Sequence, residues 1–294
     1  MKYLFIAQHK KTWPVDLMCQ LLGVTRSGFY RFNKLNQHKP DDDPVELEVI
    51  DWIKKIAEET NFTYGSRRMR KALNALGYPF GRRRTKTLMC KANVFVRYRR
   101  KYKVTTNSNH KQPVFENVLN RQFQVDKPNQ AYVSDITYIW TNEGWLYLTV
   151  MIDLFSRKVV GWDMSNRMKA ATVCNALTMA IWQRRPSAGL VVHSDRGSQY
   201  ASKKYRQILQ KHQFTGSMSR KGDCWDNSVA ESFFARLKSE RVSWKNYQTR
   251  WEAKQDILKY ITMFYNNQRL HSFLGYKSPN QFECEYIDEI KKVA

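Results

Sequence analysis

The sequence lacks long apolar runs and paired cysteines. No run of eighteen apolar residues occurs in the 294 residues, so we expect neither a membrane-spanning helix nor a membrane partner. The apolar run near the N-terminus ends at Gln8, which is too short for a secretory signal. The five cysteines lie far apart and form no CxxC pair, which argues against a zinc ribbon or a disulfide framework and favours the cytoplasm.

Acidic residues are also scarce. The chain has 26 Asp and Glu against 50 Lys and Arg, giving a formal net charge of +24. A charge of this size repels itself and is usually balanced by a polyanion. Nucleic acid is the partner that this balance favours, although a ribosome-like or merely solvated basic surface would give the same count. At 42% apolar residues, the chain can bury more than one core.

The N-terminal region, residues 1–38, is predicted to be a helix-turn-helix. Two short helices are expected within residues 13–34, with Gly23 closing the first and Thr25 or Ser27 capping the second. The first helix carries an apolar stripe of Leu17, Leu21 and Leu22. Any small helical hairpin would have the same spacing, so DNA binding by this unit is one of two interpretations.

Residues 45–102 are predicted to form a second, basic helical domain. From Thr60 to Phe115 there are fifteen Lys and Arg and no acid. A charge run is usually a solvated face, but one this long favours a surface that follows DNA phosphates. The predicted DNA contacts of this region are Arg67, Arg68, Arg82, Arg83, Arg84 and Lys86. The polar segment 103–129 is predicted to be a linker.

From residue 130 the pattern changes to strands. "AYVSDITYIW" and "WLYLTVMIDLF" flank the turn "TNEG" and predict a hairpin, and "RKVVGWDMS" predicts a third strand. Strands and helices then alternate in the order β-β-β-α-β-α-β-α. This order predicts an α/β domain over 130–243 with a mixed sheet, followed by a helical extension over 244–294.

Three acids stand out in this domain. Asp135 lies within a strand, where Asp is disfavoured. Asp195 follows the buried strand "LVVHS", at the end where α/β sheets hold ligands, and Glu231 lies in the first turns of a helix. If the two strands are neighbours, the three carboxylates can meet. Mg²⁺ or Mn²⁺ would then relieve their repulsion, and two such ions form a phosphoryl-transfer site.

Each acid also has a purely structural interpretation. Ser228 and Glu231 have the spacing of a capping box. Asp195 could be a turn residue, and Asp135 a buried hydrogen-bonding acid. Asp153, in "MIDLFSRK", is similar to these acids but is interpreted as a strand-end carboxylate.

"VSDITYI", "HSDRGSQY" and "DNSVAESFFARLKSE" resemble the three motifs of bacterial insertion-sequence transposases with a DDE catalytic core, close to retroviral integrases. "YGSRRMRKAL" resembles the upstream helical domain and "YNNQRLHSFLGYKSP" the C-terminal signature of the subfamily often called OrfB, encoded by a second reading frame. The resemblance covers roughly residues 45–282. It implies a ribonuclease-H-like fold, with a mixed five-stranded sheet, flanking helices and preceding all-α helix-turn-helix domains.

The resemblance implies that Asp135, Asp195 and Glu231 form a catalytic triad that binds two Mg²⁺ (or Mn²⁺) ions. The implied reaction is DNA strand cleavage and strand transfer at the element ends, by in-line phosphoryl transfer without a covalent protein–DNA intermediate. The subfamily also has a basic residue seven positions after the Glu, here Lys238, which lies on nearly the same helix face and is a predicted DNA contact.

Further predicted DNA contacts are His193 and Arg196, because His193 shares a strand face with Asp195. The implied partners are double-stranded DNA, both the terminal inverted repeats and the target, and a second copy of the chain in at least a dimer. The product of an upstream overlapping frame is a further implied partner.

Two other classes of protein explain part of the pattern. His193 and Arg196 match the H-x-x-R box of tyrosine recombinases, which need no metal, but the box follows a strand here and would leave the three acids unexplained. A non-catalytic helix-turn-helix accessory factor or repressor would explain the charge without catalysis.

Overall fold

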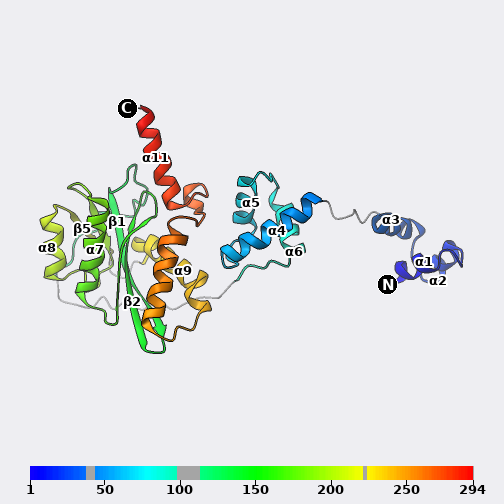
Figure 1. Ribbon diagram of the computed structural model, residues 1–294, viewed down its shortest axis with the longest axis horizontal. Coiled ribbons are helices and arrows are strands. Elements are labelled where there is room, and N and C mark those ends of the chain that lie inside the picture. The colour runs from blue at the N-terminus through cyan, green and yellow to red at the C-terminus, as the bar shows by residue number, and fades with distance from the viewer. Residues whose placement is uncertain (38–43, 98–112, 221–223, 294) are drawn as a thin grey trace.

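The computed structural model describes residues 1–37, 44–97, 113–220 and 224–293 (Figure 1). Two small helical units precede an α/β unit with a helical extension. The first part of the predicted linker at 103–129 lies outside the described residues. No helix in the described ranges is long and apolar enough to cross a membrane.

The N-terminal unit has three helices: α1 (Lys2–His9), α2 (Val15–Leu21) and α3 (Arg26–Gln37). Gly23 has a φ of +60° after α2, and the Thr25 hydroxyl accepts the Gly28 N–H at 3.2 Å, as predicted for the turn and the cap. Helix α1 was not predicted. The core contains Met18 and Cys19, whereas Leu21 is 78% exposed, so the predicted leucine stripe does not form the core.

The second unit also has three helices: α4 (Pro44–Glu59), α5 (Ser66–Ala75) and α6 (Arg82–Lys91). Its core includes Ile53, Met69 and Leu88. Phe264 and Leu270 of the C-terminal extension pack against this core, so the second unit contacts the α/β unit directly. Figure 1 shows it on the same side of the sheet as α9.

The α/β unit contains a mixed five-stranded sheet in the order β3-β2-β1-β4-β5. Its strands are β1 (Ala131–Thr141), β2 (Gly144–Asp153), β3 (Val159–Ser165), β4 (Val191–Ser194) and β5 (Thr215–Met218). The first three strands are antiparallel neighbours, and β4 and β5 run parallel to β1. The predicted mixed five-stranded sheet is therefore confirmed.

Helices cover both faces of this sheet (Figure 1). One face packs against α7 (Ala170–Arg184) and α8 (Lys203–Lys211). The other packs against α9 (Ser228–Glu240), α10 (Arg250–Lys259) and the π-helical turn η3 (Tyr260–Tyr265). The chain also has short 3₁₀ turns, η1 (Cys224–Asn227), η2 (Val242–Trp244) and η4 (Ser272–Leu274), and a last helix, α11 (Pro279–Val293).

Residues 113–130 have no helix or strand but pack on the α/β unit. The Phe115 ring lies over Gly216, where a Cβ atom would come within 2.8 Å of it. The Leu119 N–H donates to the Ser217 hydroxyl at 3.1 Å. This part of the predicted linker is therefore a fixed covering segment.

Close packing of β3 on α7 requires a glycine at position 161. A Cβ atom there would lie 2.3 Å from the Ala176 carbonyl oxygen and 2.9 Å from the Ala180 backbone nitrogen.

A side chain at position 161 would force the backbone of α7 or β3 to move. We therefore expect Gly161→Ala to lower the free energy of unfolding by about 1–3 kcal/mol, measured by hydrogen exchange of the β3 and α7 amides. Gly81→Ala is the control, since that site has open space and an ordinary φ of −72°. Equal effects of the two substitutions would contradict the packing explanation.

Candidate active site

The parallel pairing of β1 with β4 brings two aspartates together. Ser134 pairs with Ser194, so the next position along the register has Asp135 beside Asp195. The Asp135 carboxylate accepts the N–H of Ile136 at 2.8 Å. The Asp195 carboxylate accepts the N–H of Gly197 at 3.0 Å, so Asp195 also stabilises the turn that follows β4.

Helix α9 carries Glu231 and packs against β1. Asn227, just before the helix, donates its side-chain N–H to the Ser134 carbonyl at 3.1 Å and ties the start of α9 to β1 beside Asp135. Ser228 is the first helical residue, and no side chain caps this helix. The capping-box interpretation of Glu231 is therefore wrong.

The acids are close enough to influence one another. Burial, then the Asp195 and Glu231 carboxylates, raise the pKa of Asp135 well above its ordinary value, and only partial compensation comes from Lys238. Burial also raises the pKa of Glu231 and lowers that of Lys238, whose ammonium lies 4.9 Å from the centroid of the Tyr138 ring. The site thus combines three carboxylates with one partly buried cation.

The donor set suits a hard divalent cation. All three groups offer carboxylate oxygens, which are the ligands that Mg²⁺ and Mn²⁺ prefer, and the raised pKa of Asp135 indicates negative charge that a cation would stabilise. Within the described residues, however, no group of three Asp, Glu, His or Cys is already arranged to hold a metal ion. Binding by all three acids therefore requires at least one of them to move towards the others.

His193 is not a DNA contact, contrary to the prediction. It is fully buried, with Nδ1 2.9 Å from the Ser217 hydroxyl and Nε2 3.2 Å from the Ser219 hydroxyl. Burial lowers its pKa to about 4, so it is neutral at pH 7. It shares a sheet face with Asp195 but lies in the core, where it links β4 to β5. Arg196 is half-buried and donates from Nε to the Ser219 carbonyl at 2.6 Å, which anchors the turn after β4.

The predicted contacts of the basic helical unit differ in their exposure and in their ion pairs. Arg68 is partly buried and lies 3.4 Å from the Glu240 carboxylate of α9, so it joins two units. Arg84 forms an ion pair with Glu46 within its own unit. The exposed members of the predicted set are Arg67, Arg82, Arg83, Arg84 and Lys86.

Sequence reasoning missed the buried ion pair to which Arg68 belongs. Arg269 is almost fully buried and makes two hydrogen bonds to Glu240, at 2.6 and 2.7 Å. The Tyr260 hydroxyl donates to the same carboxylate at 2.8 Å. The one available signal was an arginine inside the C-terminal signature, in "NNQRLH".

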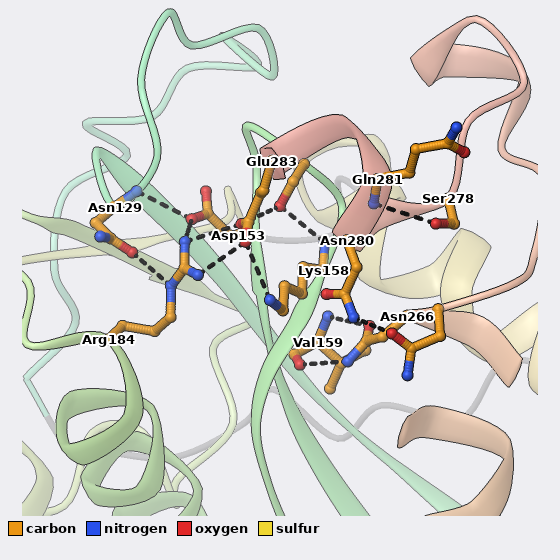
Figure 2. Close-up of polar contacts among 12 residues, drawn as sticks. Asn129, Asp153, Lys158, Val159, Arg184, Asn266, Ser278, Asn280, Gln281 and Glu283 are labelled. Atoms are coloured by element: carbon orange, nitrogen blue, oxygen red, sulfur yellow. Dashed lines mark hydrogen bonds and ion pairs between the residues drawn. The ribbon is translucent and has the colours of Figure 1, made fainter. Parts of the chain in front are cut away.

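Asp153 lies in a polar cluster with Asn129, Arg184 and Glu283 (Figure 2). Its carboxylate accepts the N–H groups of Asn129 and Phe155, at 2.9 and 3.0 Å. Figure 2 shows Arg184 between Asp153 and Glu283, at 3.4 Å from the first and 2.8 Å from the second. The cluster ties α11 to the end of the hairpin, so Asp153 is a structural strand-end acid.

Comparisons with known proteins give the following similarities. Residues 125–224 and 231–286 each match an integrase core domain family, and residues 44–102 match an HTH-like domain family. The chain is 39% identical over 290 residues to transposase InsF for insertion sequence IS3A of Escherichia coli (strain K12), covering 96% of this chain and 98% of the relative. It is 43% identical over 270 residues to the insertion element IS600 uncharacterized 31 kDa protein of Shigella sonnei, covering 92% and 98%.

Two solved structures are similar at lower identity. One is the simian T-cell lymphotropic virus intasome in complex with PP2A regulatory subunit B56 gamma, with 18% identity and a TM-score of 0.46, covering 78% of this chain and 73% of that chain. The other is the trimeric HTLV-2 integrase catalytic core domain in complex with magnesium, with 14% identity and a TM-score of 0.41, covering 53% and 96%.

The Asp153 cluster makes stability depend on pH. Burial raises the pKa of Asp153 to about 6, above the ordinary value near 3.8, so the folded chain holds a proton that the unfolded chain releases. The stability that this bound proton contributes to the folded chain is fully present below pH 4 and is lost as the pH rises through 6. We therefore expect Asp153→Asn to gain about 2 kcal/mol in unfolding free energy relative to the native protein between pH 4 and 7.

Urea denaturation of both proteins across this pH range measures the difference. Because the same remaining groups titrate in both proteins, subtraction isolates Asp153. If the unfolding free energies of the two proteins change in parallel with pH, or if the variant becomes less stable relative to the native protein as the pH rises, the raised pKa of Asp153 is contradicted.

Proposed function

The chain belongs to the IS3 family of insertion-sequence transposases, and from this premise we propose that it cuts DNA at the ends of its element and joins them to a target. The observation that carries the proposal is the mutual influence of Asp135, Asp195 and Glu231 at the end of β4. In this proposal, the three side chains hold two Mg²⁺ or Mn²⁺ ions. When bound, such ions activate the attacking oxygen and stabilise the leaving oxygen.

The remaining residues of the site bind and orient the strand. Lys238, whose charge acts on Asp135, offers a cation for a phosphate next to the reacting one. Water or a DNA 3′-hydroxyl attacks in line, and no side chain serves as nucleophile. The nearby hydroxyl groups of Ser134 and Tyr200 are buried and hydrogen-bonded to each other at 2.8 Å, which supports a reaction without a covalent protein–DNA intermediate.

DNA outside the site is held by the basic helical unit in this proposal. Its exposed cations Arg67, Arg82, Arg83 and Lys86 suit phosphate contacts that do not read sequence. The DNA partners are the terminal inverted repeats and the target. Joining two ends calls for at least two copies of the chain, and the product of an upstream overlapping frame is a further proposed partner.

The three acids can be tested separately from DNA binding. We expect Asp135→Asn, Asp195→Asn and Glu231→Gln each to lower the rate of Mg²⁺-dependent cleavage of element-end DNA by at least about 100-fold, because each removes a charged ligand. Gel analysis of labelled strands measures the products. DNA affinity, measured by fluorescence anisotropy, should fall little or rise, because negative charge is removed.

Asp126→Asn is the matched control, since Asp126 is an exposed carboxylate of the same unit and should retain full cleavage. Chelation of the metal ion should abolish DNA cleavage by the native protein. Cleavage that persists in chelator, or in Asp135→Asn, would refute the proposed triad. DNA that is bound but never cut would instead favour an accessory binding protein.

The salt dependence of binding tests the basic unit. Each phosphate contact contributes roughly 0.9 to the slope of log affinity against log salt. We expect the double variant Arg83→Gln, Lys86→Gln to reduce this slope by about 1–2. The control pair Arg185→Gln, Lys211→Gln removes the same charge at the ends of α7 and α8, on the other face of the sheet. An equal loss of slope in both pairs would indicate a general charge effect and not a contact surface.

A further inference from the structure

A cavity of about 270 Å³ lies between α5, α9 and the segment that follows η3. Four arginines from four separate segments line it: Arg68, Arg157, Arg236 and Arg269. The hydroxyl groups of Ser228, Ser232 and Ser272 lie in the same wall, and none of the described lining residues is acidic. The cavity therefore offers cationic and neutral donors together.

The positive charge of this cavity is only partly balanced. Glu240 pairs with Arg68 and Arg269 and thus supplies one carboxylate for four guanidinium groups. His271 also lines the cavity, and its pKa shows the effect of this positive charge. Burial and then the charges of the four arginines lower its pKa to about 3, so it adds no charge at neutral pH.

Two buried nitrogen atoms of residues that line the cavity have no hydrogen-bond partner in the described chain. Arg157 is 5% exposed, and its Nη2 donates to the Phe123 carbonyl at 2.9 Å. Its guanidinium stacks at 4.0 Å from the centroid of the Phe273 ring, which forms part of the cavity wall. Within the described part of the chain, Arg157 Nη1 has no hydrogen-bond partner, and neither has Nδ1 of His271. Buried charged donors are costly to leave unpaired, so this arrangement favours an anionic occupant.

We infer that this cavity binds a phosphate group of the DNA strand being processed, an inference that rests on the proposed function. Guanidinium groups form paired hydrogen bonds with phosphate oxygens, and serine hydroxyls donate hydrogen bonds to the phosphate oxygens that remain. The volume accommodates a phosphodiester with part of its sugar, beside the apolar wall of Phe233 and Phe273.

The position of the cavity on α9 favours a DNA phosphate as its occupant. At 100° per residue, Ser228 and Ser232 lie about 60° and 100° from Glu231 around the helix axis, and the other lining residues of α9 lie about 140–160° from it. The serine edge of the cavity is thus the part nearest to the helix face that carries the proposed catalytic acid. A DNA strand whose reacting phosphate lies at Glu231 would pass over the surface of α9 that carries Ser228 and Ser232, towards Arg68 of α5.

Arg236 is the variant of choice because it is exposed and no ion pair of the described chain depends on it. We expect Arg236→Gln to weaken binding of a DNA oligonucleotide about tenfold, measured by fluorescence anisotropy. Arg236→Lys keeps the charge without the paired donors and should recover only part of the affinity. Ser272→Ala is a second, conservative variant with the same direction and a smaller effect. Arg185→Gln, on the other face of the sheet, should bind within about twofold of the native protein.

The His271 ring protons provide a readout inside the cavity. Their NMR signals should shift when the oligonucleotide is added to the native protein, and this shift should be lost in Arg236→Gln. A parallel titration uses inorganic phosphate. Shifts with inorganic phosphate but none with DNA would overturn the assignment to a DNA phosphate, and no shift with either would overturn the site itself.

Failure of this inference is distinguishable from failure of the proposed function. If Arg236→Gln binds DNA as well as Arg185→Gln while the native protein still cleaves DNA, the cavity is not a phosphate site and the proposed function stands. If Asp135→Asn cleaves normally, the proposed triad fails whatever the cavity binds.

Discussion

The parallel register between β1 and β4 is the constraint on which the site depends. It holds Asp135 beside Asp195 although the two charges repel each other and burial disfavours the charged form of Asp135. A slip of one residue would turn Asp135 to the opposite face of the sheet, because side chains alternate. The register is fixed by apolar cores on both faces, with Val133 on the α9 side and Tyr132 on the α7 side. The hydrophobic effect thus offsets an electrostatic penalty that is concentrated at one strand end.

Helix α9 connects this strand end to the rest of the molecule. Glu231 lies in its first turns, and Glu240 at its end is bonded to Arg269 and Arg68. A buried ion pair contributes little net stability, because its desolvation cost cancels much of the attraction. Its directional hydrogen bonds can still fix how α5 lies against α9. In this interpretation the Glu240 carboxylate, together with the packing of Phe264 and Leu270, sets the orientation of the basic helical unit relative to the three acids.

Local patterns predicted the elements well and side-chain surroundings poorly. Alternation and turn residues located the β1–β2 hairpin, and helical periodicity located α7, because both signals lie within one segment. The same alternation put His193 on the face of Asp195 but could not reveal that Ser217 and Ser219 of a later strand cover it. Charge counting similarly grouped Arg68 with the exposed arginines, since its partner is 172 residues away. In the seven-residue helix α2, two apolar faces were available, and packing against α1 and α3 selected the one with Met18 and Cys19.

The bonds at the two ends of α9 also limit how the three acids can close around an ion. Displacement of the whole helix would break the bond from Asn227 to the β1 backbone and strain the hydrogen bonds between Glu240 and Arg269. Rotation of the Glu231 side chain about its own bonds breaks none of these. Glu231 is partly exposed, and burial without an ion pair already raises its pKa. Rotation towards a cation would therefore stabilise its charged form, so ion binding and closure of the site favour each other without movement of the helix.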